Sequence, residues 1–471
     1  MSLTATGYHI NSFRLQDLYI RSKKALLLWT LIVGLLLTSF SNYPAVILIS
    51  LLLTLYSFGE LVLALGKIVP VKEITTFLMV VQLLLAPFLD YEMLAPQKIS
   101  AMVVSQEVYF SFALPAVLAF LIGMRLRFSK HKSIQGEMNF SETDQKRHSK
   151  IGITLIVIGY VFLFLQNVLV IPGLEFIIVV LSLFRFVGIF YLMYSNNRFY
   201  QILILAVAIP ATISTVRGSV FIDLLIWFFF IYAFAAIKFR IKTRTTVLIV
   251  FSSIIFFMIL QSVKIDYRKI EWRNNRVTQT ATGVNLFADI FSANLQSIDK
   301  NSLWLMQAKF ITRLNQGFIV SYVLKKDVVR TTNKTNTYFS NELWGVVLPR
   351  FIYSEKATVG DNKKFRFLTG IPLATSVSMN VGILGDGYGN FGHTGGIFFC
   401  FGFGLFLNLV MGYCLSLSKR IKTILFWMPL ILFYVMRAGN EFYIIANWTV
   451  KVALIVIAYY YVSKRVFGKA I

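Results

Sequence analysis

The residues best suited to chemistry gather in a glycine-rich run toward the C-terminal end of the chain. Residues 385–392 read Gly-Asp-Gly-Tyr-Gly-Asn-Phe-Gly, and His393 follows directly. An imidazole titrates near neutral pH and can accept a proton from a hydroxyl nucleophile, and Asp386 offers a carboxylate for the same role. Tyr388 has a ring that can stack on a sugar and a hydroxyl that can reach a phosphate. In the alternative interpretation the run is only a tight entry into a helix, since it matches neither the Walker nor the dinucleotide-binding pattern.

Several basic residues could meet a phosphate. Arg217 lies between two apolar stretches without an acidic neighbour in sequence. A guanidinium near hydrocarbon usually faces a cavity or a charged partner, and its planar fork suits bidentate contact with phosphate. If Arg313, Arg350, Lys356 and Arg437 converge with Arg217, the group can hold a diphosphate. The alternatives are an Arg217 that snorkels to the membrane surface and ordinary solvated charges at the other positions.

Other familiar catalytic patterns are missing from the sequence. There is no His-Glu-x-x-His zinc motif and no Gly-x-Ser-x-Gly elbow. Residues 264–393 contain no Asp-x-Asp pair, the usual carboxylate grip on a metal-bound nucleotide sugar. The two cysteines, Cys400 and Cys414, lie in one apolar segment and imply neither a disulfide nor a metal site. We therefore expect no metal and no other cofactor.

The elements that must position these residues are membrane spans. The chain is 57% hydrophobic and 14% charged, whereas soluble chains are about 45–50% apolar and about 25% charged. A helix needs about twenty mainly apolar residues to cross the hydrocarbon core. The sequence predicts an all-α polytopic membrane protein with three regions, namely nine spans in 1–263, a large outer segment at 264–393 and three spans in 394–471. The twelve or so predicted spans lie near 24–41, 43–66, 74–94, 104–126, 151–170, 173–194, 199–215, 218–237, 245–263, 394–417, 421–437 and 442–463.

The charges of the connections predict the orientation. Lys and Arg concentrate in alternate connections, above all around 125–150 and 238–244, and cytoplasmic connections are the ones that carry this excess. We therefore expect both termini in the cytoplasm and residues 264–393 outside. Lys and Arg outnumber Asp and Glu by about two to one in this outer segment, which an anionic partner or anionic lipid headgroups would explain. The net charge of +25 thus gives no reason to expect nucleic acid.

Two further features lead to structural expectations. Arg185 lies inside an apolar stretch, and its structural interpretation is a pair with an acidic residue such as Glu60 or Asp223. Within the outer segment, helical spacing of apolar residues predicts one amphipathic helix that lies on the bilayer surface. The residues at this spacing are Leu303, Met306, Phe310, Leu314, Phe318 and Tyr322.

Local patterns carry a resemblance to a known group of membrane enzymes. They are Thr215-Val216-Arg217-Gly218-Ser219, Arg313-Leu314-Asn315-Gln316-Gly317, Pro349-Arg350-Phe351 and the glycine run 385–392. With the twelve-span plan and the large segment before the last three spans, they resemble the Wzy-type polymerases of bacterial O-antigen and capsule repeat units, within the group of O-antigen polymerases and ligases. The patterns and the outer segment cover about a third of the chain.

The resemblance implies a GT-C-like glycosyltransferase architecture in the bacterial inner membrane, acting in lipopolysaccharide synthesis. A glycan held on undecaprenyl diphosphate would pass to the terminal sugar of another lipid-linked repeat unit, without a metal. Arginines would bind the diphosphate and stabilise its charge as it leaves, and Arg217, Arg313 and Arg350 match those roles best. His393 or Asp386 would activate the acceptor hydroxyl. Besides the lipid-linked oligosaccharide and the bilayer, a chain-length regulator is a candidate partner.

Two other functions fit the same sequence. An O-antigen ligase shares the donor and the fold but passes the glycan to lipid A core, and nothing in the sequence specifies the acceptor. The other is a non-enzymatic transporter of lipid-linked oligosaccharides. Many transporters have two related halves, whereas the halves of this chain look unrelated and one outer segment dominates, which favours the enzyme.

Overall fold

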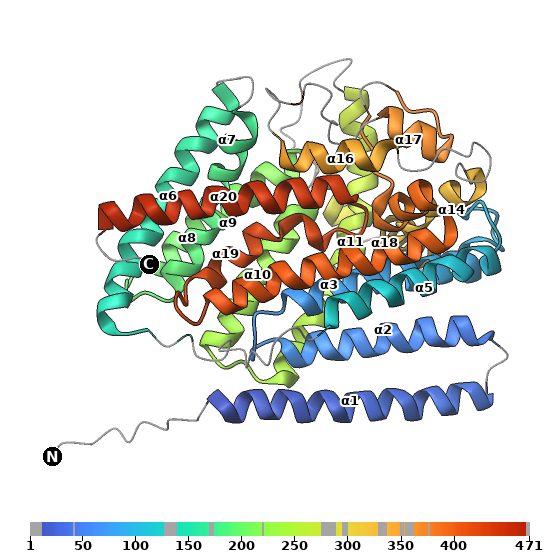
Figure 1. The fold of residues 1–471 in the computed structure, drawn as a ribbon, viewed down its shortest axis with the longest axis horizontal. Helices are drawn as coiled ribbons and strands as arrows, with labels where there is room; N and C mark the ends of the chain where they lie inside the picture. The colour runs from blue at the N-terminus through green and yellow to red at the C-terminus, as the bar shows by residue number, and fades with distance from the viewer. Residues whose placement is uncertain are drawn as a thin grey trace.

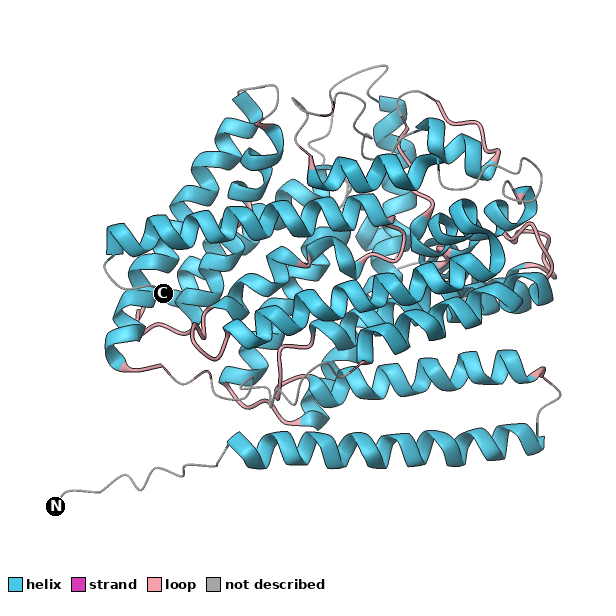
Figure 2. Ribbon diagram, viewed as in Figure 1, coloured by secondary structure: helices cyan, strands magenta, loops and turns pink. Residues whose placement is uncertain are grey.

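The structure of the 471-residue chain is a computed structural model. It describes residues 12–40, 43–126, 138, 140–168, 174–218, 221–274, 289–293, 300–327, 337–348, 353, 362–374 and 377–467. Every regular element in these ranges is a helix (Figure 2), so the predicted all-α class is confirmed.

The helices have the following bounds. Before the outer segment they are α1 (Ser12–Phe40), α2 (Ala45–Ala64), α3 (Val71–Val80), the π-helical turn η1 (Val81–Leu85), α4 (Ala86–Leu89), the π-helical turn η2 (Asp90–Leu94), α5 (Gln106–Arg125), α6 (Glu142–Val168), α7 (Glu175–Ser182), α8 (Phe184–Met193), α9 (Tyr200–Gly218), α10 (Phe221–Lys238) and α11 (Thr243–Asn274). The others are α13 (Lys300–Leu314), α14 (Gly317–Lys326), α16 (Thr337–Val347), α17 (Asn362–Thr369), α18 (Gly382–Leu417), α19 (Ile424–Ile431), the 3-10 turn η3 (Phe433–Met436) and α20 (Phe442–Phe467). Both α11 and α18 extend into the predicted outer segment.

Nine helical segments in the described ranges are long and apolar enough to cross a membrane, which makes this a multi-pass membrane protein. They fall in nine of the twelve predicted windows. The windows 199–215, 218–237 and 421–437 hold α9, α10 and α19 instead, which are not among the nine. The helix α19 has only eight residues and leads into the turn η3. The number of twelve spans therefore stays a prediction.

The arrangement of the long helices bears on the topology. In Figure 1, α1, α2, α5, α18 and α20 run in nearly the same direction across the view. The helix α1 begins and α20 ends at the left, whereas α14 and α17 lie toward the right. The start of α1 and the end of α20 thus lie toward one side of the bundle and α14 and α17 toward the other, which agrees with the predicted placement of the termini and of the outer segment on opposite sides.

Close approach of α5 and α18 forms the centre of the bundle. A Cβ on Gly123 would lie 2.3 Å from the backbone oxygen of Phe401, and a Cβ on Gly404 would lie 2.2 Å from that of Phe120. Glycine at such crossings lets helix backbones meet, because no side chain separates them. The side chain of Asn408 adds a hydrogen bond to the carbonyl oxygen of Gly123 at 3.2 Å. The glycine run lies at the start of α18, so this packing fixes its position.

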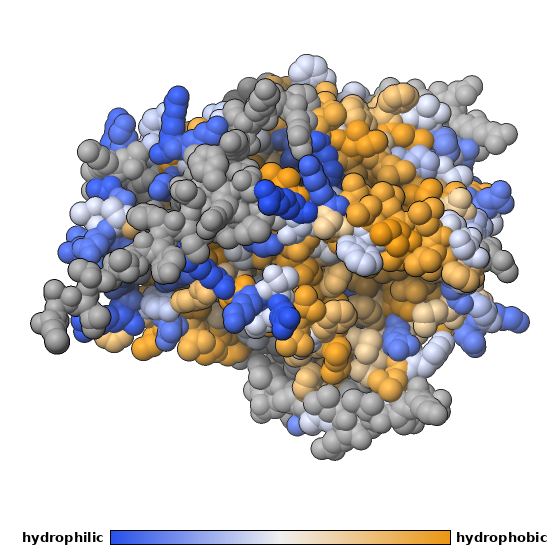
Figure 3. Space-filling view, turned by 90° about the horizontal axis from the view of Figure 1, so that it is seen from below, coloured by the Kyte–Doolittle hydropathy of each residue, from blue (hydrophilic) through white to orange (hydrophobic). Residues whose placement is uncertain are grey.

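The face toward α1 and α2 is suited to lipid. Figure 3 shows hydrophobic side chains gathered over a broad part of this face, above all toward the right of the view, with hydrophilic ones near its middle and at both ends. Large apolar side chains of α1 are exposed, including Leu28, Trp29 and Leu35. A contiguous apolar surface of this kind is a sign of contact with a membrane or a partner. It supports the assignment of these helices to the bilayer.

The prediction of one amphipathic helix over 303–322 is wrong. Asn315 and Gln316 separate α13 from α14. The buried Asn315 side chain donates from Nδ2 to Asp90 Oδ2 at 3.0 Å and accepts from the backbone N–H of Phe318 at 3.1 Å. A side-chain amide that bonds nearby backbone competes with the helix. The chain therefore breaks where Asn315 docks on the membrane helices.

The predicted ion pair of Arg185 with an acidic residue such as Glu60 or Asp223 is also wrong. Glu60 and Asp223 both form ion pairs with other cations. Arg185 instead donates to the carbonyl oxygen of Ser182, and its guanidinium lies 4.8 Å from the centroid of the Phe186 ring. A carbonyl and an aromatic face thus stabilise this buried cation in place of a carboxylate.

Candidate functional site

A lysine and three carboxylates meet where helices of the outer segment pack on the membrane helices. Lys364 Nζ contacts Glu342 Oε1 and lies 2.8 Å from Asp386 Oδ1 and 3.1 Å from Glu441 Oε2. All four side chains are buried. They come from α16, α17, α18 and the residue before α20. This group, the Lys364 cluster, therefore joins two helices of the outer segment to two membrane helices.

Burial and charge shift two pKa values in the cluster. Burial raises the pKa of Glu342 well above its usual value; Asp386 and Glu441 raise it further, and Lys364 opposes them. Burial alone would lower the pKa of Lys364, but the three carboxylates outweigh it and hold that pKa well above its usual value. Burial and the neighbouring acids thus favour the neutral form of Glu342, and the three acidic side chains favour the charged form of Lys364.

The geometry of the cluster suits a structural role. Oxygens of Glu342, Asp386 and Glu441 lie within 4.8 Å of one another, a spacing that could also hold a metal ion. Each of the three carboxylates already contacts Lys364 Nζ, so the ammonium of the chain itself takes the central position. Removing one partner of a buried ion pair typically costs about 3–5 kcal/mol. The cluster thus fixes α16 and α17 on the membrane helices.

Asp386 is enclosed by hydrogen-bond donors. Its Oδ1 accepts from Lys364 and, at 2.8 Å, from Asn390 Nδ2. Its Oδ2 accepts from the backbone N–H of Phe442 at 3.1 Å. The side chain is fully buried, with 0% exposed. Of the two candidate bases, Asp386 is therefore part of the Lys364 cluster, and His393 is the exposed one.

A break in α18 positions His393. Gly392 has φ 70° and ψ −166°, a conformation that residues with a Cβ rarely adopt. The break interrupts the helix between the glycine run and the apolar part that crosses the membrane. The His393 ring lies 5.6 Å from the ring of Phe112 on α5, and the Tyr388 ring lies 4.9 Å from the same ring, centroid to centroid. The phenylalanine thus brings two candidate residues together.

The chain segments that carry Arg313 and Arg437 are neighbours. Arg313 is exposed in the last turn of α13, three residues before Gln316. A Cβ on Gly439, two residues after Arg437, would lie only 2.7 Å from Gln316 Oε1. The backbone N–H of Gln316 also donates to the carbonyl oxygen of Gln82 at 3.1 Å. These contacts bring two of the predicted basic segments to one place on the membrane helices.

The other predicted phosphate-binding residues are described in part. Arg437 forms an ion pair with Asp223 in the first turn of α10. Arg217 lies near the end of the preceding helix α9, and its side chain is outside the described residues. Arg350 and Lys356 lie outside the described residues altogether. A cluster of all five cations therefore stays a prediction.

Sequence reasoning did not identify three members of the Lys364 cluster, namely Glu342, Lys364 and Glu441. A weak signal existed for two of them. Lys364 precedes the buried Leu368 by four residues, and Glu342 precedes the buried Val346 by four. In a helix each therefore lies on the buried face. Charged side chains are rarely buried unless they are paired. The helical spacing alone therefore did not distinguish Lys364 and Glu342 from ordinary solvated charges.

The chain matches no known protein-family description, no curated protein and no solved structure. Its function is therefore inferred from the placement of its own residues. The features available are an exposed imidazole at a helix break, basic segments that adjoin one another and a buried cluster that fixes the outer helices.

Proposed function

We propose that this protein is a glycosyltransferase that polymerises oligosaccharide repeat units carried on undecaprenyl diphosphate at the outer side of the bacterial inner membrane. The observation that carries the proposal is the position of His393. Its exposed imidazole follows the break at Gly392 and shares the Phe112 ring with Tyr388. A base at this position can reach a sugar hydroxyl of a substrate that approaches from the outer segment, while the lipid of that substrate stays in the bilayer.

The reaction needs one proton acceptor and a stabilised leaving group. His393 accepts the proton of the acceptor hydroxyl as that oxygen bonds to the anomeric carbon of the donor glycan. The bond between this carbon and the diphosphate oxygen breaks, and the diphosphate leaves with the bonding electrons. Positive charge near this oxygen stabilises the transition state most. In the proposal Arg217, Arg313 and Arg350 supply that charge, with Lys356 and Arg437 as further contacts.

The Lys364 cluster supports the same function by position. It ties α16 and α17 to the first turns of α18 and α20, and the glycine run belongs to α18. Transfer between two bound lipid-linked substrates requires that their reacting atoms be held within near contact distance. A rigid attachment of the outer helices meets that requirement better than a loosely tethered segment.

The decisive experiment is reconstitution of the purified full-length protein with lipid-diphosphate-linked repeat units. The proposal expects a ladder of longer glycans, which His393→Gln and Arg313→Gln each reduce at least about 100-fold, as loss of a general base or an electrostatic donor commonly does. Thr394→Ala alters the exposed residue next to His393 on α18, and Lys325→Gln alters an exposed cation on α14, the helix after the one that carries Arg313, so both serve as controls. Both controls are expected to keep the ladder.

The outcome also separates the alternatives. Transfer of glycan only after addition of lipid A core would identify an O-antigen ligase. Movement of the lipid-linked oligosaccharide across proteoliposomes without any covalent product would identify a transporter. A full ladder from the His393→Gln protein would support the polymerase function but show that His393 is not the general base.

A further inference from the structure

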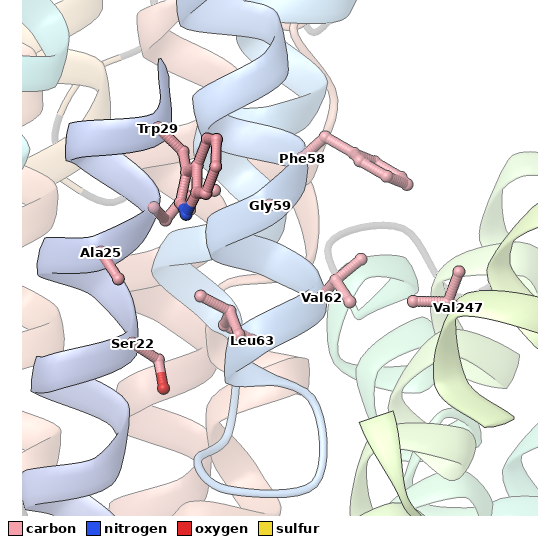
Figure 4. Close-up of a pocket in the computed structure, with 9 residues that line it drawn as sticks. Ser22, Ala25, Trp29, Phe58, Gly59, Val62, Leu63 and Val247 are labelled. Atoms are coloured by element: carbon pink, nitrogen blue, oxygen red, sulfur yellow. The ribbon is translucent and has the colours of Figure 1, made fainter. Parts of the chain in front are cut away.

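An apolar groove opens on the bilayer-facing surface between α1, α2 and α11, and none of its lining residues belongs to the helices that carry His393 and Arg313. Its volume is about 420 Å³. Figure 4 shows side chains of all three helices around it. Those that form its walls include Ala25, Leu26, Trp29, Phe58, Val62 and Val247. Apart from Ser22, every residue that lines the groove is apolar, so it offers an apolar ligand an almost wholly hydrocarbon surface.

One end of the groove is basic. Arg21 precedes the lining residue Ala25 by four positions on α1, and Arg244 precedes the lining residue Val247 by three on α11. At these spacings each arginine lies one helical turn from the groove on the same helix face. Both are exposed, and neither pairs with an acidic side chain in the part of the chain that the structure describes. Lys242, just before α11, is also exposed.

The nearest buried carboxylate on the groove helices does not neutralise this end. Glu60 on α2 already pairs with Lys23 and Arg125. Glu73 on α3 is a second buried carboxylate near α1, and its Oε1 accepts a hydrogen bond from Tyr19 at 3.2 Å, so Glu60 and Glu73 both have partners other than Arg21. Since the loop charges predict this end to be cytoplasmic, the basic mouth lies at the headgroup level of the cytoplasmic leaflet.

We propose that the groove is a binding site for an anionic phospholipid of the cytoplasmic leaflet. An acyl chain lies along α1 and α2 past Trp29, and the phosphate is held between Arg21 and Arg244. Basic pockets between membrane helices on this side of a bilayer suit anionic headgroups. A zwitterionic choline headgroup brings a cation next to the same arginines, which disfavours it. A second copy related by a two-fold axis along the membrane normal would place one basic face against another.

The test uses the fluorescence of Trp29, which is 66% exposed on the groove. The full-length protein is placed in nanodiscs that contain equal parts of phosphatidylglycerol and phosphatidylcholine, with bromine on the acyl chains of only one of them. Bromine quenches tryptophan on contact. The chain has seven tryptophans. The quenching of Trp29 alone is therefore obtained as the difference between the fluorescence quenching of the wild type and that of Trp29→Phe. Brominated phosphatidylglycerol is expected to quench Trp29 several-fold more than brominated phosphatidylcholine.

Substitution of each arginine tests whether Arg21 and Arg244 bind the lipid headgroup. Arg21→Gln and Arg244→Gln are each expected to lower the preference for phosphatidylglycerol about fivefold, from the effect of one basic residue near an anionic surface. The matched control, Lys464→Gln with Arg465→Gln, removes two exposed charges at the end of α20 and is expected to keep the preference.

Three results would overturn the proposal. They are equal quenching by the two lipids in the wild type, an unchanged preference in both single arginine variants, and protection of Trp29 from both lipids. The last result would mean that a second copy of the chain covers the groove.

Discussion

Lys364 Nζ lies 2.8 Å from Asp386 Oδ1 inside the protein, and this contact joins a helix of the outer segment to a membrane helix. The two residues are 22 positions apart, and both are at most 3% exposed. Because Asp386 belongs to the glycine run, this contact gives the run a structural role in addition to any catalytic role. It also separates the two candidate bases, since Asp386 is enclosed and His393 is exposed.

Removal of the lysine should loosen the outer helices. Lys364→Met leaves three buried carboxylates without their cation, and we expect a loss of about 3–5 kcal/mol in the free energy of unfolding. Denaturant unfolding of the purified protein measures this loss. Arg366→Met changes an exposed residue on the same helix and is expected to shift stability by less than about 0.5 kcal/mol. Equal stability of the two variants would contradict the structural role of the cluster.

Glu342 should make stability depend on pH. Its pKa in the folded protein is raised by burial and by Asp386, so folding favours its protonated form. The contribution of Glu342 to the free energy of unfolding is fully present below the ordinary glutamate pKa of about 4.3. It is lost as the pH rises through the raised pKa of Glu342 in the folded protein. The pKa of Lys364 is also raised, so its charge persists across this range.

The check is the melting temperature of the wild type and Glu342→Gln between about pH 5 and about pH 9. Stability of the wild type is expected to fall toward the alkaline end, and the neutral amide is expected to flatten that slope. Glu107→Gln, at an exposed position of α5, should keep the wild-type slope. Parallel curves for wild type and Glu342→Gln would exclude this residue as the source.

Two glycines of α18 should respond in opposite ways to alanine. The Cβ of Gly404→Ala would lie 2.2 Å from the Phe120 backbone oxygen, which cannot move independently of α5. We expect a loss of about 1–3 kcal/mol, the usual cost of overpacking. Gly402→Ala meets nothing within 4 Å and should be neutral or stabilising by up to about 1 kcal/mol, since alanine favours the helix. Melting temperatures in detergent compare the two, and similar values would argue against the close α5–α18 contact.

The break in α18 should matter for the proposed activity. Gly392→Ala strains a backbone with φ 70° by about 1–3 kcal/mol and favours a continuous helix that moves His393 away from Phe112. Glycan polymerisation is expected to fall about tenfold or more, while the folded protein is still recovered from the membrane. Gly412→Ala on the same helix, where a Cβ meets nothing within 4 Å, is the control. Full activity of Gly392→Ala would show that the break does not position the base.

The sequence was informative about the membrane plan and less so about the site. Apolar windows of about twenty residues predicted nine helices that the structure also has, because burial in hydrocarbon demands such lengths. The prediction failed at 303–322, where the helical spacing is real but Asn315 bonds to Asp90 from a distant helix. Periodicity reports which residues are apolar, and it does not report a hydrogen bond to another part of the chain.

By itself the sequence determined the all-helical class, the lipid-facing composition and the glycine run that ends at His393, because these depend on local composition and order. Only the tertiary structure decided that Lys364 lies among three carboxylates, that Asp386 is enclosed and that Tyr388 and His393 share one aromatic ring. The reason is that the energy of a buried charge depends on which charges the fold brings within a few ångströms of it. Residues 342, 364, 386 and 441 meet only once four separate helical elements have packed.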